Sequence, residues 1–333
     1  MVKTAIITGA AGFVGSNALR YFLDNTDMNF IVIDSFKHKG DSLRLQEIKY
    51  PDRVKIYTHD LTTQFSDAAI KSFGDIDAIL NIASESHVDR SISDPVPFVE
   101  NNVKLALTMA ELGIKLKPRI FLNMGTDEVF GPALNGQFHH EWDIHKPSNP
   151  YAASKSAQDQ ILFSYWRCYG LPLVMTHTMN IFGPMQDKEK FIPMLISNIF
   201  HEKNVTIHGR DGDIGSRMYL HVDNLADAWL FLMQNTTPTK YMDNHHLDQR
   251  PDSYNITGLE EIDNLTLAKI VADLLGKELK FKLLDFHSAR PGHDRRYALD
   301  GSKIKQLGWS HPFTLRKSLE DTINWTLNNE VWM

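Results

Sequence analysis

Short runs of apolar and β-branched residues recur along the first half of the chain, separated by stretches with helical spacing. Such runs are typical of buried strands, and their alternation with helices predicts an α/β fold with a doubly wound parallel sheet. Asn149 and Pro150 suit the cap and first turn of a helix over Pro150–Tyr169. The expected strands are Lys3–Thr8, Phe30–Ile33, Val54–His59, Ala78–Ala83, Arg119–Met124 and Leu173–His177.

The alternation weakens after about Asn180, where Gly and Pro become frequent and the predicted elements become shorter. His221–Met233 has helical spacing and is expected to rejoin the first part of the chain. We therefore expect two lobes. The larger covers residues 1–178 and is rejoined by about 219–235, and a smaller α/β lobe covers 179–218 and 236–333.

Composition excludes several classes of protein. The 333 residues carry a formal net charge of −6, and no basic cluster is present that would coat a nucleic acid. Cys168 is the only cysteine, which excludes an internal disulfide and fits a reducing compartment. No stretch approaches the ~18 apolar residues of a membrane span, and the chain opens directly into a predicted strand. We expect a cytoplasmic protein with no nucleic-acid or membrane partner.

A glycine-rich turn follows the first predicted strand and opens a helix. Gly9, Gly12 and Gly15 allow a tight turn and a close approach of the backbone to a pyrophosphate at the helix N-terminus. Asp34 ends the second strand about twenty residues later, where a carboxylate binds ribose hydroxyls and repels a 2′-phosphate. This context predicts a dinucleotide site that prefers NAD over NADP. Asp60 and Leu61, after the third strand, could meet the adenine.

Two groups of residues indicate acid–base chemistry. Tyr151 and Lys155 lie four residues apart and so share one helix face, where the ammonium is expected to lower the pKa of the phenol. Thr126, Asp127 and Glu128 follow a predicted strand. A dehydrogenase needs one base for one hydroxyl proton, whereas Asp127 and Glu128 add a second acid–base pair. That second pair is what removal of water from a sugar carbon requires.

These motifs together resemble the extended short-chain dehydrogenase/reductase family, with its Rossmann-like fold, and within it the nucleotide-sugar 4,6-dehydratases. The resemblance covers nearly the whole chain. It is carried by the residues already described and by the runs Ser84–Ser91, Thr126–Gly131, Asn180 with Gly183–Pro184, Glu189–Pro193 and Arg290–Ala298.

The resemblance implies a role for each site residue. Thr126 would hydrogen-bond the sugar 4-hydroxyl, Asp127 would be the general acid, Glu128 the general base and Tyr151 the oxidation base, with Lys155 as its partner. Residues expected at the cofactor are Gly9, Gly12, Phe13, Val14, Gly15, Asp34, Ser35, Asp60, Leu61, Ala83, Ser84, Asn101, Tyr151 and Lys155. Residues expected at the substrate are Ser86, His87, Thr126, Asn180, Lys190, His208, Arg217, Asn255, Arg290 and His293.

The resemblance also implies the reaction. NAD would oxidise sugar C4, the new ketone would acidify C5, and Glu128 would then remove the C5 proton. Asp127 must be protonated to expel the C6 hydroxyl, and neighbouring Glu128 should raise its pKa. Hydride returned to C6 would leave a 4-keto-6-deoxy sugar of deoxysugar biosynthesis, such as the rhamnose pathway. The resemblance further implies dTDP-glucose as substrate and a homodimer joined through helices near Pro97–Gly113 and Pro150–Tyr169.

Several residues depart from the family pattern. Gly125 stands where serine is usual, Ile181 replaces an asparagine, His208 replaces an aromatic residue, and the segment Gly209–Arg217 is about two residues longer than usual. The nucleotide could therefore be dTDP, UDP or CDP. A C4 epimerase of the same fold is the alternative enzyme, although it has no use for the Asp–Glu pair. A silent scaffold that binds NAD or a nucleotide sugar is the alternative outside enzymes.

A histidine-rich segment before the catalytic helix raises the question of a metal site. His139, His140, Glu141 and His145 are not spaced as ligands on a helix, and the proposed chemistry needs no metal. We expect a lid or solvated loop there, and no metal.

Overall fold

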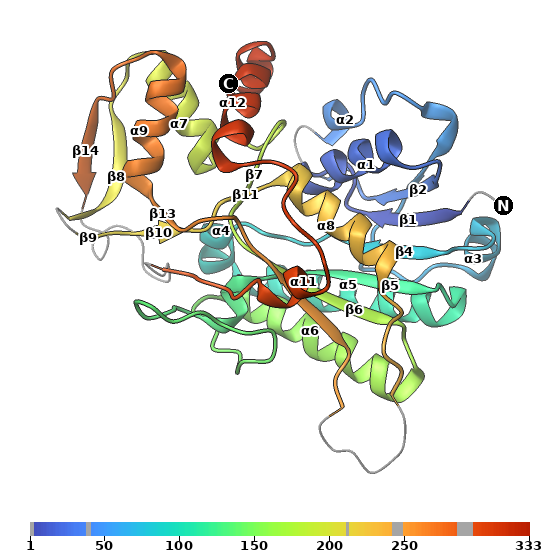
Figure 1. Cartoon of the computed structure of the whole chain (residues 1–333). Coiled ribbons are helices and arrows are strands. Elements are labelled where there is room, and N and C mark those ends of the chain that lie inside the picture. The colour runs from blue at the N-terminus through green and yellow to red at the C-terminus, as the bar shows by residue number, and fades with distance from the viewer. Residues whose placement is uncertain (1–2, 38–40, 211–212, 242–248, 285–295) are drawn as a thin grey trace.

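The computed structural model describes residues 3–37, 41–210, 213–241, 249–284 and 296–333. Its centre is a seven-stranded sheet in the order β12-β6-β5-β4-β1-β2-β3, in which every neighbouring pair is parallel (Figure 1). The strands are β1 (Thr4–Thr8), β2 (Asn29–Asp34), β3 (Val54–Thr58), β4 (Ala78–Asn81), β5 (Ile120–Thr126), β6 (Leu173–Thr178) and β12 (Asp252–Ile256). The predicted Rossmann-like α/β fold is confirmed.

All six predicted strands are present, but the seventh corrects the expected lobe boundary. β12 comes from the segment assigned to the smaller lobe, and it pairs with β6 from Asp252 beside Val174 to Ile256 beside Thr178. Its sequence, Asp-Ser-Tyr-Asn-Ile, lacks a continuous apolar run. The strand is buried because it completes the main sheet, which is a long-range pairing that local pattern does not reveal.

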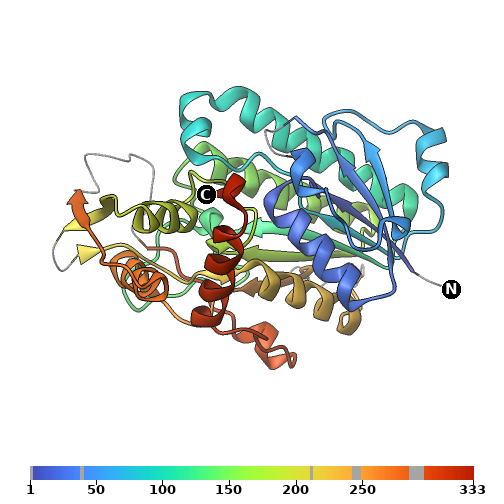
Figure 2. The same cartoon turned by 90° about the horizontal axis from the view of Figure 1, so that it is seen from above.

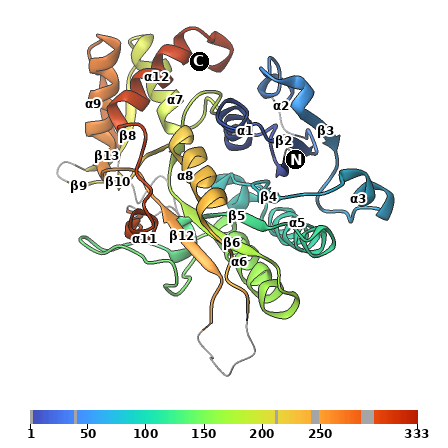
Figure 3. The ribbon, with the colours of Figure 1, turned by 45° about the vertical axis from the view of Figure 1, so that its right-hand side comes forward.

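Helices cover both faces of the sheet, as a parallel sheet with buried strands requires (Figure 3). On one face α1 (Phe13–Asn25) packs against α8 (Val222–Asn235), with Phe22 and Trp229 fully buried. On the other face α5 packs against α6, and Trp166 is fully buried. The helices of this second face are α3 (Asp67–Phe73), α5 (Pro95–Leu116) and α6 (Pro150–Tyr169).

The smaller lobe has its own core, in which Leu195, Leu267 and Leu319 are fully buried. Figure 2 shows it at the end of the molecule opposite the N-terminus. It contains α7 (Phe191–Phe200), α9 (Asn264–Leu275), α12 (Leu315–Leu327), β8 (Val205–Arg210), β9 (Asp213–Ile214) and β14 (Phe281–Leu284).

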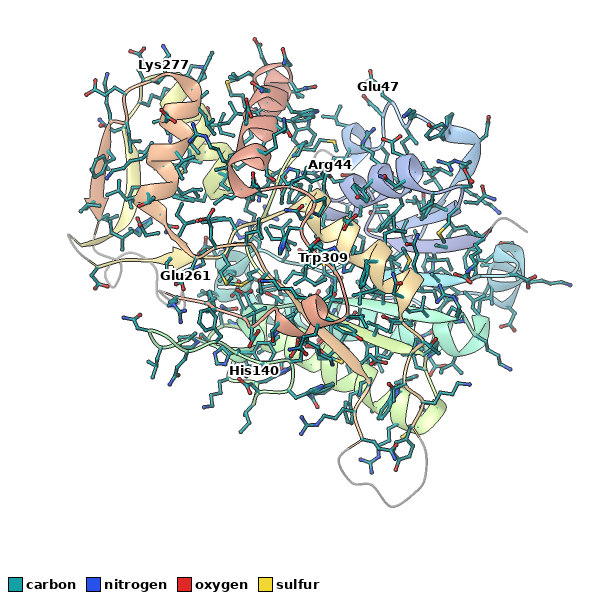
Figure 4. The ribbon with its side chains drawn as sticks, viewed as in Figure 1. Arg44, Glu47, His140, Glu261, Lys277 and Trp309 are labelled. Atoms are coloured by element: carbon teal, nitrogen blue, oxygen red, sulfur yellow. The ribbon has the colours of Figure 1, made fainter. Side chains whose placement is uncertain are left out.

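Short elements connect the two lobes. Trp309, labelled in Figure 4, follows α11 (Ser302–Gln306) and donates a 2.7 Å hydrogen bond to Asp227 of α8, which ties the C-terminal segment to the main sheet layer. The remaining short elements are α2 (Asp41–Arg44), α4 (Val88–Ser93), β7 (Ile181–Phe182), β10 (Ser216–Arg217), β11 (Leu220–His221), β13 (Ile262–Asp263), η1 (Pro51–Arg53), η2 (Asp127–Phe130) and η3 (Glu330–Trp332).

Candidate active site

A cavity of about 860 Å³ lies at the carboxyl ends of the sheet strands, where open α/β sheets bind ligands. Every residue expected to bind the dinucleotide lines it. These are Gly9, Gly12, Phe13, Val14, Gly15, Asp34, Ser35, Asp60, Leu61, Ala83, Ser84, Asn101, Tyr151 and Lys155.

The glycine turn leaves no room for side chains. Gly9 has a φ of 67°, and a Cβ there would lie 2.8 Å from the Cα of Ala83. A Cβ on Gly15 would lie 2.3 Å from the carbonyl oxygen of Gly9. Gly12 caps α1 without a side-chain hydrogen bond, so backbone N–H groups at this helix N-terminus remain available to an anion. The cradle fits the pyrophosphate of a dinucleotide.

Asp34 lies at the end of β2 and lines the same cavity. Its carboxylate accepts hydrogen bonds from the backbone N–H groups of Ala11, at 2.9 Å, and Phe36, at 3.0 Å. It therefore also holds the glycine turn in place. Lys37, the nearby cation, pairs with Asp60, and this hydrogen bond is the main reason that the pKa of Asp60 is lowered to about 2.

Tyr151 and Lys155 both line the cavity from α6, but they do not interact as expected. The Lys155 ammonium donates instead to the Met124 carbonyl, at 2.7 Å, and to Gln158 Oε1, at 2.6 Å. The pKa of Tyr151 is raised, first by burial and then by the charge of Glu128, although a hydrogen bond with Thr126 opposes the shift. The expectation that Lys155 lowers the Tyr151 pKa is therefore wrong for this structure. Burial also lowers the pKa of Lys155 to about 8.

Thr126, Asp127 and Glu128 lie at the junction of β5 and η2. Thr126 Oγ1 donates to Asp127 Oδ1 at 3.1 Å, and the Asp127 side chain is buried. Burial raises the pKa of Asp127 to about 7, and repulsion from Glu128 adds to the shift. This upward shift of the Asp127 pKa is the one expected from the sequence, but burial contributes more to it than the charge of Glu128 does. Glu128 is half-buried and accepts a 3.0 Å hydrogen bond from Asn149 Nδ2.

Only some of the residues expected at the substrate line the main cavity. Ser86, His87 and Lys190 line the main cavity. Arg217 is close enough to Asp127 for its charge to oppose the rise in that pKa. Arg217 and the remaining described residues do not line the cavity. Thr126 is buried at the end of β5, Asn180 is exposed after β6, His208 is half-buried in β8, and Asn255 lies in β12.

Asn255 has structural contacts in this protein, and its expected contact with the substrate stays a prediction. Its side chain is fully buried, and its amide donates to the carbonyl of His139 at 3.0 Å, so the described contacts are structural. It lies within β12, the strand that sequence reasoning did not predict. Arg290 and His293 lie outside the described residues.

The residues that line the cavity but were not predicted as site residues include Arg44 of α2, and Val331 and Trp332 of η3. The Arg44 guanidinium lies 2.7 Å from Asp187 and 4.8 Å from the centre of the Trp332 ring (Figure 4). The side chain is buried. These contacts join three segments far apart in sequence, and no local pattern predicts them.

Within the described ranges, no helix combines the length and the apolar character that crossing a membrane requires.

Comparison with known proteins places this site in a family. Residues 6–322 match the family model described as GDP-mannose 4,6 dehydratase. A dTDP-glucose 4,6-dehydratase from Escherichia coli is 32% identical, over 98% of this chain and 94% of its own length. The crystal structure of a dTDP-glucose 4,6-dehydratase from Bacillus anthracis in complex with NAD is 27% identical and has a TM-score of 0.84, covering 99% of this chain and 98% of the other.

The fold alone does not separate dehydratases from epimerases. The structure of a Thermus thermophilus UDP-glucose 4-epimerase in complex with NAD has a TM-score of 0.82 at 22% identity, and it covers 98% of this chain and 99% of the other. The family match and the full-length relative confirm the predicted resemblance, and with it an NAD-dependent dehydratase at the level of the family. The chain belongs to the GDP-mannose 4,6 dehydratase family.

Proposed function

We propose that this protein converts dTDP-glucose to dTDP-4-keto-6-deoxyglucose and water, with NAD as a tightly held cofactor. The observation that carries the proposal is the burial of the Asp127 carboxyl, hydrogen-bonded to Thr126, at the junction of β5 and η2. A buried carboxyl with a pKa of about 7 is partly protonated near neutral pH, as a general acid must be, and it lies beside a second carboxyl, Glu128. An epimerase has no step that needs this pair.

The cofactor would lie along the glycine turn with its ribose at Asp34, since these residues fit a dinucleotide without a 2′-phosphate. When bound, NAD would supply the hydride acceptor for sugar C4 and the hydride donor for C6. The sugar would lie beside Tyr151, on the side of the cavity formed by Ser86, His87 and Lys190.

Each side chain then has one task. Tyr151 takes the proton of the C4 hydroxyl, and Thr126 orients that hydroxyl. Glu128, held by Asn149, removes the proton on C5, which the adjacent ketone has made acidic. Asp127 gives its proton to the departing C6 hydroxyl. Lys155 donates hydrogen bonds to Met124 and Gln158, and it would provide a positive charge at the cavity wall.

The choice of dTDP as the nucleotide rests on the dTDP-glucose 4,6-dehydratases among the relatives, which match nearly the full length of the chain. Lys190 would contact the diphosphate from the cavity wall, and Arg217 lies near the catalytic pair. His208 remains the proposed contact to the base.

A homodimer is part of the proposal. α5 and α6 form the paired helices on one face of the sheet, and apolar side chains remain exposed on them. Val96 is 64% exposed, Leu107 38% and Tyr169 63%. A second copy that covers these side chains would give the expected helix-to-helix interface.

Incubation of the purified protein with dTDP-glucose and with UDP-glucose, followed by mass spectrometry, tests the proposal. We expect loss of one water from the sugar, with a higher kcat/KM for dTDP-glucose. A higher value for UDP-glucose would overturn the nucleotide assignment alone. An unchanged mass with inversion at C4 would overturn dehydration in favour of epimerisation, and bound NAD without turnover would indicate a silent scaffold.

A further inference from the structure

A second group of ionisable side chains lies outside the main cavity and was given no task in the proposed dehydration. His145 comes from the segment before α6, Asp159 from α6 and His177 from β6. One possible ligand atom of each lies within 4.8 Å of the other two. None of the three lines the main cavity.

The group is held in place by its neighbours. His177 Nε2 lies 3.1 Å from Asp159 Oδ2, and Asn123 Nδ2 lies 3.4 Å from the other carboxylate oxygen. His145 Nδ1 lies 2.8 Å from Ser156 Oγ. A hydroxyl partner on one ring nitrogen orients an imidazole so that its other nitrogen can serve as a ligand. The side chains are therefore positioned much as ligating groups are.

Burial leaves one ring nitrogen of this group unsatisfied. Asp159 is 0% exposed and His177 is 1% exposed. Nδ1 of His177 is buried without a hydrogen-bond partner among the described residues. A buried carboxylate requires strong compensation.

The group also has an open side. A separate cavity of about 240 Å³ is lined by His145, Asp159 and His177, together with Glu141 and Asp143. This space can hold a water or another oxygen ligand. Two imidazoles, one carboxylate and one open position are a donor set that suits Zn²⁺ and related transition metals, whereas Mg²⁺ and Ca²⁺ prefer oxygen ligands alone.

We propose that His145, Asp159 and His177 bind one divalent transition-metal ion, with Zn²⁺ as the best fit, which fastens the segment before α6 to α6 and β6. This proposal departs from the expectation of no metal, which was drawn from the spacing of a different set of residues. Of the four residues considered from the sequence, only His145 takes part. The other two ligands come from elements that the sequence spacing could not bring together.

The site lies directly behind the wall of the main cavity. A Cβ at Gly125, which lines that cavity, would lie 2.8 Å from Cδ2 of His177. The glycine at this position therefore makes room for the imidazole. The metal would stabilise the wall of the active site without contacting the substrate.

Metal analysis of untagged protein tests the proposal. Protein stripped with EDTA should take up one equivalent of Zn²⁺, and one equivalent of Co²⁺ should give visible absorption bands typical of a low-coordinate nitrogen and oxygen site. Zn²⁺ should also raise the thermal unfolding midpoint, because an ion that binds only the folded state stabilises it. Neither readout depends on dehydratase activity.

His145→Ala should weaken Zn²⁺ binding by at least about 100-fold, since loss of even an outer partner of a ligand costs ~10–100-fold. His140→Ala is the matched control. Its side chain is in the same segment and is 63% exposed (Figure 4). It should bind Zn²⁺ like the wild type. Circular dichroism checks that both variants fold. Absence of stoichiometric uptake by the wild type, or unchanged uptake by a folded His145→Ala variant, would overturn the proposal.

Discussion

Asn149 Nδ2 donates a 3.0 Å hydrogen bond to Glu128 Oε2, while its own Oδ1 accepts from the backbone N–H of Ala152 at 2.9 Å. One side chain therefore caps the helix that carries Tyr151 and also holds the proposed base. The residue that sequence reasoning identified only as a helix cap thus joins the two catalytic segments.

Two substitutions at Asn149 should separate its role as the cap of α6 from its role in holding Glu128. Asn149→Ala should lose the cap and destabilise the protein by about 1 kcal/mol. Asn149→Asp keeps a capping oxygen but places a carboxylate against Glu128, so it should reduce kcat with a smaller loss of stability. Denaturant unfolding and steady-state kinetics measure the two effects. Equal stability of Asn149→Ala and wild type would contradict the capping role.

Asp127 should make product formation depend on pH. Its pKa of about 7 means that the protonated fraction falls as pH rises through neutrality, so kcat should decline on the alkaline side. Asp127→Asn should be slower by about 10²–10⁴-fold and should lack this decline. A pH profile of kcat for both enzymes checks the assignment, and an alkaline limb that persists unchanged in Asp127→Asn would assign it to another group.

The Asp127 carboxyl should make the stability of the protein fall as pH rises. An ordinary aspartate, whose pKa is lowered by folding, has the opposite effect. The folded protein holds this proton more tightly than the unfolded chain, because burial raises the folded-state pKa. The contribution to stability is therefore present at low pH and is lost as pH rises from about 4 to about 7. Unfolding midpoints of wild type and Asp127→Asn, measured across this range, should diverge in favour of the variant as pH rises.

Glu128→Gln should allow oxidation at C4, because Tyr151 and the cofactor cradle are unchanged, and should stop at the removal of the C5 proton. Reduced nicotinamide should then accumulate during the first, incomplete turnover, and its absorbance records this. Glutamine can still accept the hydrogen bond from Asn149, so the change is confined to the loss of a base. Turnover at the wild-type rate would show that Glu128 is not the base.

Asp34 should determine the choice of cofactor. Asp34→Asn keeps an oxygen for the backbone hydrogen bonds from Ala11 or Phe36 but removes the charge that repels a 2′-phosphate. The preference for NAD⁺ over NADP⁺ should narrow by about 1–3 kcal/mol, measured as a ratio of Kd values. Asp52→Asn, on an exposed turn of the same lobe, is the control and should leave the ratio unchanged. Tighter binding of NADP⁺ by the wild type would refute the role of Asp34.

Local pattern was sufficient for six of the seven strands of the main sheet and for the cofactor cradle. The six predicted strands and the glycine turn depend on short apolar runs and on close backbone contacts, such as Gly15 against Gly9. Local pattern was insufficient where a strand or side chain is fixed by residues that are distant in the sequence. The strand containing Asn255 is fixed by pairing with β6, and Lys155 is directed to Met124 and Gln158 by the packing of α6 on the sheet. Spacing placed Tyr151 and Lys155 on one face but could not give their contacts or their burial.

The fate of the hydride on sugar C4 tests the central claim most directly. With dTDP-glucose deuterated at C4, the account predicts that deuterium appears in the C6 methyl group of the product, because the same cofactor molecule removes and returns it. In D₂O with unlabelled substrate, solvent deuterium should enter C5, since Glu128 can exchange its proton before returning it. Deuterium that remains at C4, with no water lost, would contradict dehydration and indicate an epimerase.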